Sequence, residues 1–261
     1  LEEASEKVSM GPARKSHVMT DKERRLTAYH ESGHAIVGHL LADCDPVHKV
    51  TIVPRGYAGG YTMSLPIEEV NYTTKAQMLA KVRMALGGRC AEALVLGDIS
   101  NGASGDIQHV TQIVRDMVTR YGMSDTLGPI VFGEQQDQVF LGRSIGHERN
   151  YSEAVAQQID QEIHRIVAEA YDDTMKILAD NRTFLDNMAE ALLEYETIDG
   201  KDVAYLQEFG TVVPRQDTQT ASLASAEAEL NSPETVAAEA VQAESALEED
   251  DSSSHQEGPQ A

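Results

Sequence analysis

The sequence predicts a mainly helical, multi-helix domain that carries a small β-ribbon and is followed by an acidic tail. Three observations lead to this prediction. Apolar residues recur at helical spacing in several long stretches. Residues 47–53 are instead β-branched and alternating, which is typical of a strand. The residues after Arg215 contain no aromatic side chain, no Lys and no Arg.

The first helix is expected to begin at Thr20-Asp21-Lys22-Glu23, where Thr20 and Glu23 form the pattern of a capping box. Apolar and small residues repeat behind it at helical spacing. Asp45-Pro46 is expected to close this helix, because the residue before a proline disfavours helical backbone. Residues 47–53, a turn at 54–56 and a second strand at 60–65 then form the ribbon.

Further helices are expected from about Thr74 to Leu96, from near Asp106, from about Ser152 to Asp180, and near Arg182–Tyr195 and Asp199–Phe209. The pair Gly87-Gly88 lies inside the first of these. Glycine weakens a helix, so this pair is expected only where close packing requires it.

The charge of the chain excludes some classes of function. The formal net charge of the 261 residues is −22, which argues against a nucleic-acid-binding protein because such a protein needs a basic face for phosphate. Half of that charge lies after Arg215, where eleven acidic residues occur and no basic residue does. Such a composition cannot offset the entropy of ordering, so residues 211–261 are expected to be a disordered acidic tail with a solubilising role.

The chain is expected to be a soluble piece of a longer protein. It starts at Leu1 rather than Met, and it contains no stretch of 18 apolar residues that could span a membrane. Its two cysteines, Cys44 and Cys90, form no CxxC pair, which favours a reducing compartment. The phosphate-binding motif GxxxxGK[ST] is absent, so the sequence predicts no P-loop ATPase site.

His30-Glu31-Ser32-Gly33-His34 is an HExxH motif on the first predicted helix. Residues four apart share one helical face, so both imidazoles can reach one ion. Glu31 can reach a water molecule there and accept its proton without binding the metal. The alternative is a pair of core histidines, but an imidazole without a partner on a buried stripe would be costly.

A catalytic zinc site needs a third protein ligand, and spacing alone leaves its identity open. His39 stands five residues after His34 and is expected to face away. Asp106, at the start of a predicted helix, is one candidate, although it could simply stabilise the helix dipole. Glu92 is the rival candidate and could instead be a structural or outer carboxylate.

The chain resembles the peptidase domain of the FtsH family, the membrane-anchored ATP-dependent zinc metalloproteases of bacteria and organelles. The resemblance covers nearly everything from Leu1 to about Phe209. The segments that carry it are residues 26–35 with the HExxH motif, 45–56, 87–89, 102–107, 117–124, 139–144 and 195–199. Departures from the family pattern are mild: Ser32 and Cys90 stand where Ala is usual, and Gly105 where Asn or Ser is usual.

The resemblance implies a zinc endopeptidase with one Zn²⁺ per chain, held by His30, His34 and Asp106, and with Glu31 as general base. It implies that residues 1–19 are the end of a AAA+ module and linker and that 20–210 form the peptidase domain. The full-length relative would be a homohexamer on the cytoplasmic face of the bacterial inner membrane. It would be anchored by N-terminal transmembrane helices and would use ATP, through the AAA+ module, to feed membrane and soluble proteins into the protease.

Two further expectations complete the sequence-based interpretation. Gly60, Tyr61, Thr62 and Met63 are expected to form an edge strand that pairs with an extended substrate through main-chain hydrogen bonds. Two other classes of function remain as alternatives, a hydrolase of non-peptide amides and a non-catalytic module that builds a ring.

Overall fold

The computed structural model describes residues 19–55, 58–66, 71–133 and 151–214. The chain divides into two units, Leu1–Val213 and Pro214–Ala261. All but the first residue of the second unit lies outside the described residues, and so do residues 1–18. The expected AAA+ remnant and the expected disorder of the tail therefore fall on parts that the structure does not describe.

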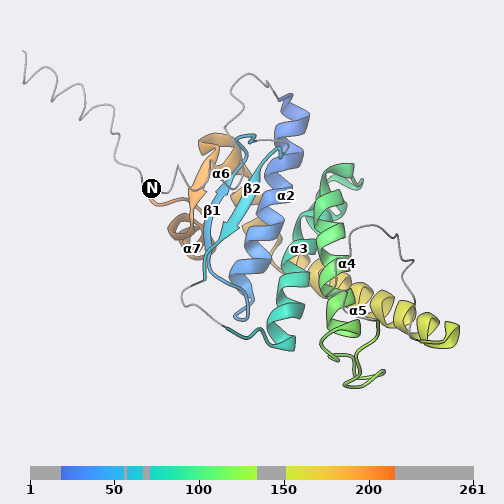
Figure 1. Cartoon of the computed structure of the whole chain (residues 1–261). Helices are drawn as coiled ribbons and strands as arrows, with labels where there is room; N and C mark the ends of the chain where they lie inside the picture. Colours follow the sequence, from blue (N-terminus) through green and yellow to red (C-terminus); the bar gives the residue numbers. More distant parts are fainter. Residues whose placement is uncertain (1–18, 56–57, 67–70, 134–150, 215–261) are drawn as a thin grey trace, which may run out of the picture. The chain divides into compact units, whose positions relative to one another are not determined.

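The described part is mainly helical, as predicted (Figure 1). Its helices are α2 (Asp21–Leu40), α3 (Lys75–Leu96), α4 (Ser104–Thr119), α5 (Glu153–Asp180), α6 (Arg182–Tyr195) and α7 (Gly200–Phe209), with a short 3₁₀ turn η1 (Asn101–Ala103) before α4. Its strands are β1 (Val47–Thr51), β2 (Tyr61–Ser64) and β3 (Thr197–Asp199).

Local capping explains where several helices begin. The side chain of Thr20 accepts a hydrogen bond from the backbone amide of Glu23, and the carboxylate of Glu23 accepts one from the backbone amide of Thr20, which is the predicted capping box. Thr74 and Gln77 form a second such box at the start of α3. Ser152 caps α5 through the amide of Val155.

Helix α2 ends earlier than predicted. Leu41 already has an extended backbone, with φ −93° and ψ 112°, so the helix ends at Leu40, six positions before Pro46. A turn follows, closed by the bond from the Cys44 amide to the carbonyl of Leu41.

The predicted two-stranded ribbon is a three-stranded antiparallel sheet with the order β2-β1-β3. Val50 of β1 pairs with Thr62 of β2 on one side and with Ile198 of β3 on the other. The third strand has only three residues, too few to show an alternating pattern in sequence. Among the residues that the structure describes, β2 lies at an edge of this sheet and pairs with β1 alone.

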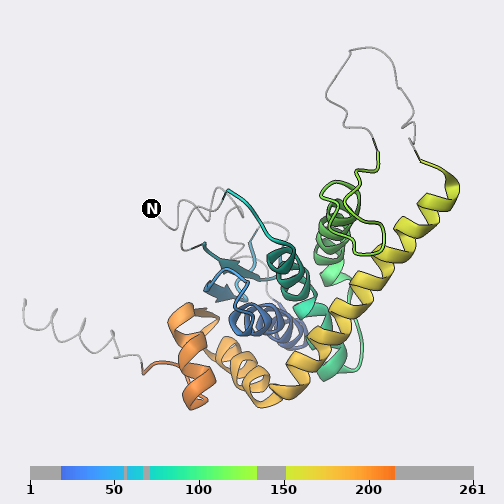
Figure 2. The same cartoon turned by 90° about the horizontal axis from the view of Figure 1, so that it is seen from below.

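Helix α2 is the centre of the packing. It contacts α3, α5, α6, α7, β1 and β2, and every residue from Thr27 to Gly38 is buried. The long helix α5 packs along α3 and α4 (Figure 2). The HExxH motif thus lies on a helix that is buried over most of its length. Residues of α3 and α4 face the motif.

Candidate metal centre

Two glycines let α2 and α3 approach each other closely at the motif. A Cβ atom placed on Gly33 would overlap the backbone carbonyl of Gly87, and one placed on Gly87 would lie 2.5 Å from the carbonyl oxygen of Gly33. Only glycine permits such a backbone approach. This close approach explains why Gly87 is tolerated inside α3, and it is the close packing that the glycine pair predicted.

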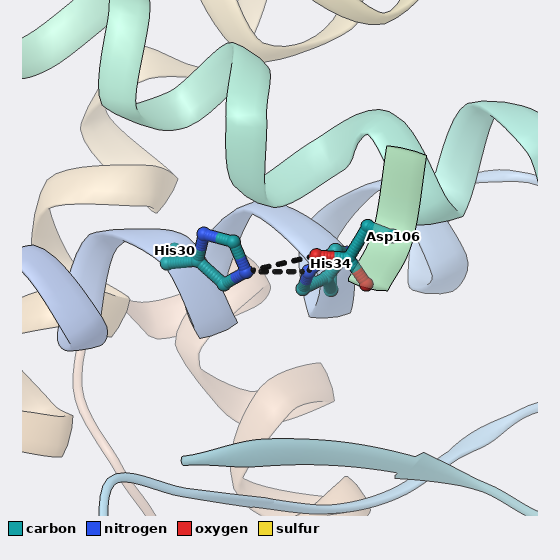
Figure 3. A group of neighbouring side chains, drawn as sticks. All are labelled: His30, His34 and Asp106. Atoms are coloured by element: carbon teal, nitrogen blue, oxygen red, sulfur yellow. Dashed lines mark hydrogen bonds and ion pairs between the residues drawn. The ribbon is translucent and has the colours of Figure 1, made fainter. Parts of the chain in front are cut away.

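His30, His34 and Asp106 converge on one point (Figure 3). The Nε2 atoms of the two imidazoles are 3.0 Å apart. Oδ2 of Asp106 lies 3.2 Å from Nε2 of His30 and 3.5 Å from Nε2 of His34. The histidines come from α2 and the aspartate from the first turn of α4, so the site depends on tertiary packing.

This donor set fits a zinc ion. Tetrahedral zinc with bonds of about 2.0–2.1 Å separates its ligand atoms by roughly 3.3 Å, and the three separations lie close to that value. Two imidazole nitrogens and one carboxylate oxygen are also ligands that zinc prefers, and they leave a fourth position open. In the described residues, no other group of three or more such side chains converges in this way.

Gly88 of α3 gives the site its room. A Cβ atom there would lie 2.6 Å from Nε2 of both His30 and His34. Any larger residue would therefore displace the Nε2 atoms of the two imidazoles. The sequence alone does not reveal this role, because a glycine pair in a helix indicates close packing without showing which residues pack there.

The outer ring nitrogens of both histidines are held in place. Nδ1 of His30 lies 2.7 Å from Oε1 of Glu92, and Nδ1 of His34 lies 2.8 Å from the carbonyl oxygen of Met84. Such partners fix the tautomer and leave the other nitrogen, Nε2, free to bind a metal at the point where the two rings meet Asp106. Glu92, the rival ligand, thus lies on the far side of His30, and its other oxygen accepts a bond from the amide of Ser100.

Glu31 is buried beside the two histidines, with 6% of its surface exposed. The hydroxyl of Thr62 donates to its Oε2 atom over 2.8 Å. Burial raises the pKa of the Glu31 carboxyl, and the nearby imidazoles of His34 and His30 only partly oppose this. A carboxylate with a raised pKa is better matched to accepting and returning a proton near neutral pH.

The local potential is negative and favours a cation. Burial alone would lower the pKa of His30, but hydrogen bonds with Asp106 and Glu92 outweigh it and raise this pKa to about 10. Burial would also raise the pKa of Asp106, yet its bonds with His30 and His34 hold it well below the usual range. The carboxylates therefore stabilise positive charge at the point where the ligands meet.

A cavity of about 600 Å³ opens at these residues. Beside the motif, its walls include Gly60, Tyr61 and Thr62 from the sheet edge and Met84 and Asp106 from α3 and α4. Met63, the fourth residue of the expected substrate strand, belongs to β2 but is not among the lining residues. Such a space is large enough for several side chains of an extended peptide.

Two other sequence expectations are decided here. His39 does point away from the site, since its Nε2 lies 2.8 Å from Oε1 of Gln207. Cys90 is fully buried, whereas Cys44 is only half-buried and lines the cavity.

A buried HExxH helix, with an aspartate oxygen close to both imidazoles and a glutamate beside them, is the arrangement expected of a zinc metallopeptidase centre. The sequence agrees with this class: residues 17–206 match the model of peptidase family M41. The chain therefore belongs to this family. The match confirms the predicted resemblance to the FtsH-type zinc metalloprotease domain.

Curated relatives support the same assignment. The chain is 69% identical over 211 residues to the ATP-dependent zinc metalloprotease FtsH of Veillonella parvula, which covers 81% of this chain and 33% of the relative. It is 54% identical over 210 residues to the FtsH protein of Chloroflexus aggregans, covering 79% and 32%. It is 48% identical over 216 residues to that of Bacillus subtilis, covering 82% and 34%.

The chain spans about a third of the length of these relatives. Among the helices that the structure describes, none combines the length and the apolar character needed to cross a bilayer.

Proposed function

We propose that this domain hydrolyses peptide bonds at one zinc ion per chain, held by His30, His34 and Asp106, with Glu31 as the general base. The observation that carries the proposal is the convergence of these three ligand atoms beside the buried carboxylate of Glu31. Zinc bound there would supply Lewis-acid activation of water and of the scissile carbonyl.

Glu31 performs the proton transfers. Its carboxylate takes a proton from the attacking water and later gives it to the nitrogen of the leaving amine. Burial supports both steps because it raises the pKa of Glu31. The difference in pKa between this carboxyl and the groups with which it exchanges the proton is then smaller.

The substrate is an extended protein segment that adds to the open edge of β2. In the described part of the chain β2 pairs with β1 on one side and with no strand on the other, and Gly60, Tyr61 and Thr62 line the cavity at the motif. Main-chain pairing at such an edge tolerates many side chains. We include Met63 in this segment as a backbone contact, because its neighbours in β2 line the cavity.

The whole protein extends beyond this chain. The relatives are named ATP-dependent zinc metalloproteases. We therefore infer a AAA+ module and linker that end at about residue 19, a peptidase domain at 20–210 and an acidic tail at 211–261. We further infer a homohexamer anchored on the cytoplasmic face of the bacterial inner membrane, which unfolds membrane and soluble proteins with ATP and feeds them to the zinc site.

The central test compares casein degradation by the full-length protein, wild type against Glu31→Gln, with zinc content measured on both. We expect the variant to keep about one zinc per chain and to lose cleavage by several orders of magnitude. A variant that still degrades casein at the wild-type rate would show that Glu31 is not the base. Casein also separates a peptidase from a hydrolase of non-peptide amides.

The substrate edge is tested with proline at Tyr61 and, separately, at Thr62. Alternate amides of a strand point to opposite sides, so one of these prolines removes a donor from the open edge of β2. The rate of peptide cleavage should fall for that variant. Unchanged cleavage by both would reject pairing along β2.

A further inference from the structure

Thr62 joins the edge strand to the general base. Its hydroxyl oxygen lies 2.8 Å from Oε2 of Glu31 and 3.1 Å from the backbone carbonyl oxygen of the same residue. The two residues belong to β2 and α2 and are 31 positions apart in sequence. This contact therefore exists only because the sheet packs against the catalytic helix.

The contact orients the carboxylate. A threonine hydroxyl carries one hydrogen, and the hydroxyl of Thr62 donates it to Oε2 of Glu31, the closer of the two Glu31 oxygens within its reach. The shorter distance is the one to the carboxylate. Because Oε2 receives this bond, it is the oxygen turned toward β2.

The strand can approach Glu31 because residue 60 is glycine. A Cβ atom on Gly60 would lie 3.0 Å from Cγ of Glu31 and 2.9 Å from Cγ2 of Thr27, tighter than ordinary contacts. The chain thus meets the side chain of Glu31 at two points. Gly60, just before β2, lies against the aliphatic part of Glu31, and Thr62 of β2 bonds to its carboxylate.

We propose that Thr62 is a positioning residue for the general base, which holds Oε2 of Glu31 and leaves Oε1 to take the proton from water. This inference rests on the proposed function of Glu31. It gives Thr62 two tasks in one residue: its backbone belongs to the strand that receives the substrate, and its side chain sets the base. Binding of a substrate strand and alignment of the base are thereby built on the same element.

The test compares Thr62→Val with Thr62→Ser. Valine keeps the shape and the strand preference of threonine but removes the hydroxyl, whereas serine restores it. Thr51→Val is the matched control, since Thr51 is a buried threonine in the adjacent strand whose hydroxyl bonds to Glu196 and Thr197 and not to the site. Cleavage of an unstructured fluorogenic peptide, zinc content and thermal unfolding are measured for all four proteins.

We expect Thr62→Val to bind zinc normally and to lose about 10- to 100-fold in kcat, the loss that a hydrogen bond to a charged group implies. Its KM should stay unchanged, because the backbone of β2 is intact. Thr62→Ser should recover most of the activity, and Thr51→Val should keep the wild-type kcat. A wild-type kcat in Thr62→Val, or a loss that Thr62→Ser does not recover, would overturn the proposal.

A crystal structure of zinc-loaded Thr62→Val supplies a readout that does not depend on turnover. We expect the carboxylate of Glu31 to leave its wild-type position or to occupy more than one. A carboxylate that stays in place would also overturn the proposal. If the wild-type protein cleaves no peptide, the proposed function fails, and this comparison still decides whether Thr62 orients Glu31.

Discussion

Gly88 of α3 stands against the ring of His30 of α2, so closely that a Cβ atom on the glycine would lie 2.5 Å from Cε1 of the imidazole. Adding even a methyl group would push the ligand nitrogens of His30 and His34 apart or away from Asp106. We therefore expect Gly88→Ala to lower zinc affinity by about 100-fold or more, at the upper end of what outer partners of metal ligands contribute. Competition with a fluorescent zinc chelator measures this.

Gly105→Ala is the matched control for that prediction. Gly105 lies next to Asp106 at the start of α4, but a Cβ atom there would meet nothing within 4 Å. Its zinc affinity should match that of the wild type. Equal affinities for Gly88→Ala and the wild type would mean that the site does not need the space left by Gly88.

Gly33 and Gly87 set the distance between α2 and α3, and we expect Gly33→Ala to destabilise the fold. The new Cβ would overlap the carbonyl of Gly87, a backbone group that cannot rotate away. Overpacking of this kind costs about 1–3 kcal/mol, which exceeds the gain of at most about 1 kcal/mol from replacing a helical glycine. Urea unfolding of the metal-free protein measures the difference.

Gly38→Ala makes the same change one turn further along α2. There the new Cβ would meet the side chain of Met84 at 3.0 Å, and a flexible methionine can move. This variant should match or exceed the wild-type stability. A similar loss in both variants would show that the crossing of α2 and α3 is not the cause.

Substitution of Glu92 tests whether its carboxylate binds the metal directly or supports His30 from outside the metal site. Its two oxygens accept bonds from His30 and from the amide and hydroxyl of Ser100, so Glu92→Gln would turn an NH₂ group toward a donor. We expect zinc affinity to fall about 10- to 100-fold, whereas Asp106→Asn, which removes a ligand, should lose far more. Isothermal titration with zinc compares the two, and a larger loss for Glu92→Gln would reverse the assignment.

The sequence predicted those parts of the fold that depend on local signals. The capping box of Thr20 and Glu23 placed the start of α2, and the spacing of His30 and His34 placed both imidazoles on one face. Asp106 could not be preferred over Glu92 from spacing, because its place depends on how α4 packs against α2. The family resemblance supplied that choice, and the structure places an oxygen of Asp106 3.2 Å and 3.5 Å from the Nε2 atoms of His30 and His34.

Long-range contacts account for what the sequence did not predict. Strand β3 is three residues long and exists because β1 offers it a free edge. Thr62 was expected to contribute only its backbone, and no pattern in β2 indicates that its hydroxyl reaches a residue 31 positions earlier. Gly88 likewise shows its purpose only when the rings of α2 are in place.

Ser32 is a departure from the family pattern with a measurable cost. Its hydroxyl is buried within α2 and has no hydrogen-bond partner in the part of the chain that the structure describes. Alanine removes the unsatisfied group and has the higher helix propensity, so Ser32→Ala should stabilise the domain by about 1 kcal/mol. Thermal unfolding measures this, and a lower melting temperature would contradict it.

Glu162 of α5 holds the segment that follows α4. Its carboxylate accepts two bonds of 2.9 Å from Arg165 and further bonds from the hydroxyls of Ser124 and Thr126. The bonds from Arg165 are the largest cause that lowers its pKa, and they outweigh the effect of burial, so that the pKa is about 2. An unfolded chain would have a glutamate pKa near 4.3.

A carboxyl with a depressed pKa in the folded state contributes stability above its unfolded pKa and loses it as the pH falls toward the folded one. For Glu162 that window runs from about pH 4.3 down to about 2. We expect Glu162→Gln to be less stable than the wild type at pH 7, and the gap to shrink by on the order of 2 kcal/mol at pH 3. Urea unfolding at both pH values, with a chelator present so that metal binding does not enter, measures the gap. A gap that is equal at pH 7 and pH 3 would show that the Glu162 carboxylate is not the acid-sensitive contact between α5 and this segment.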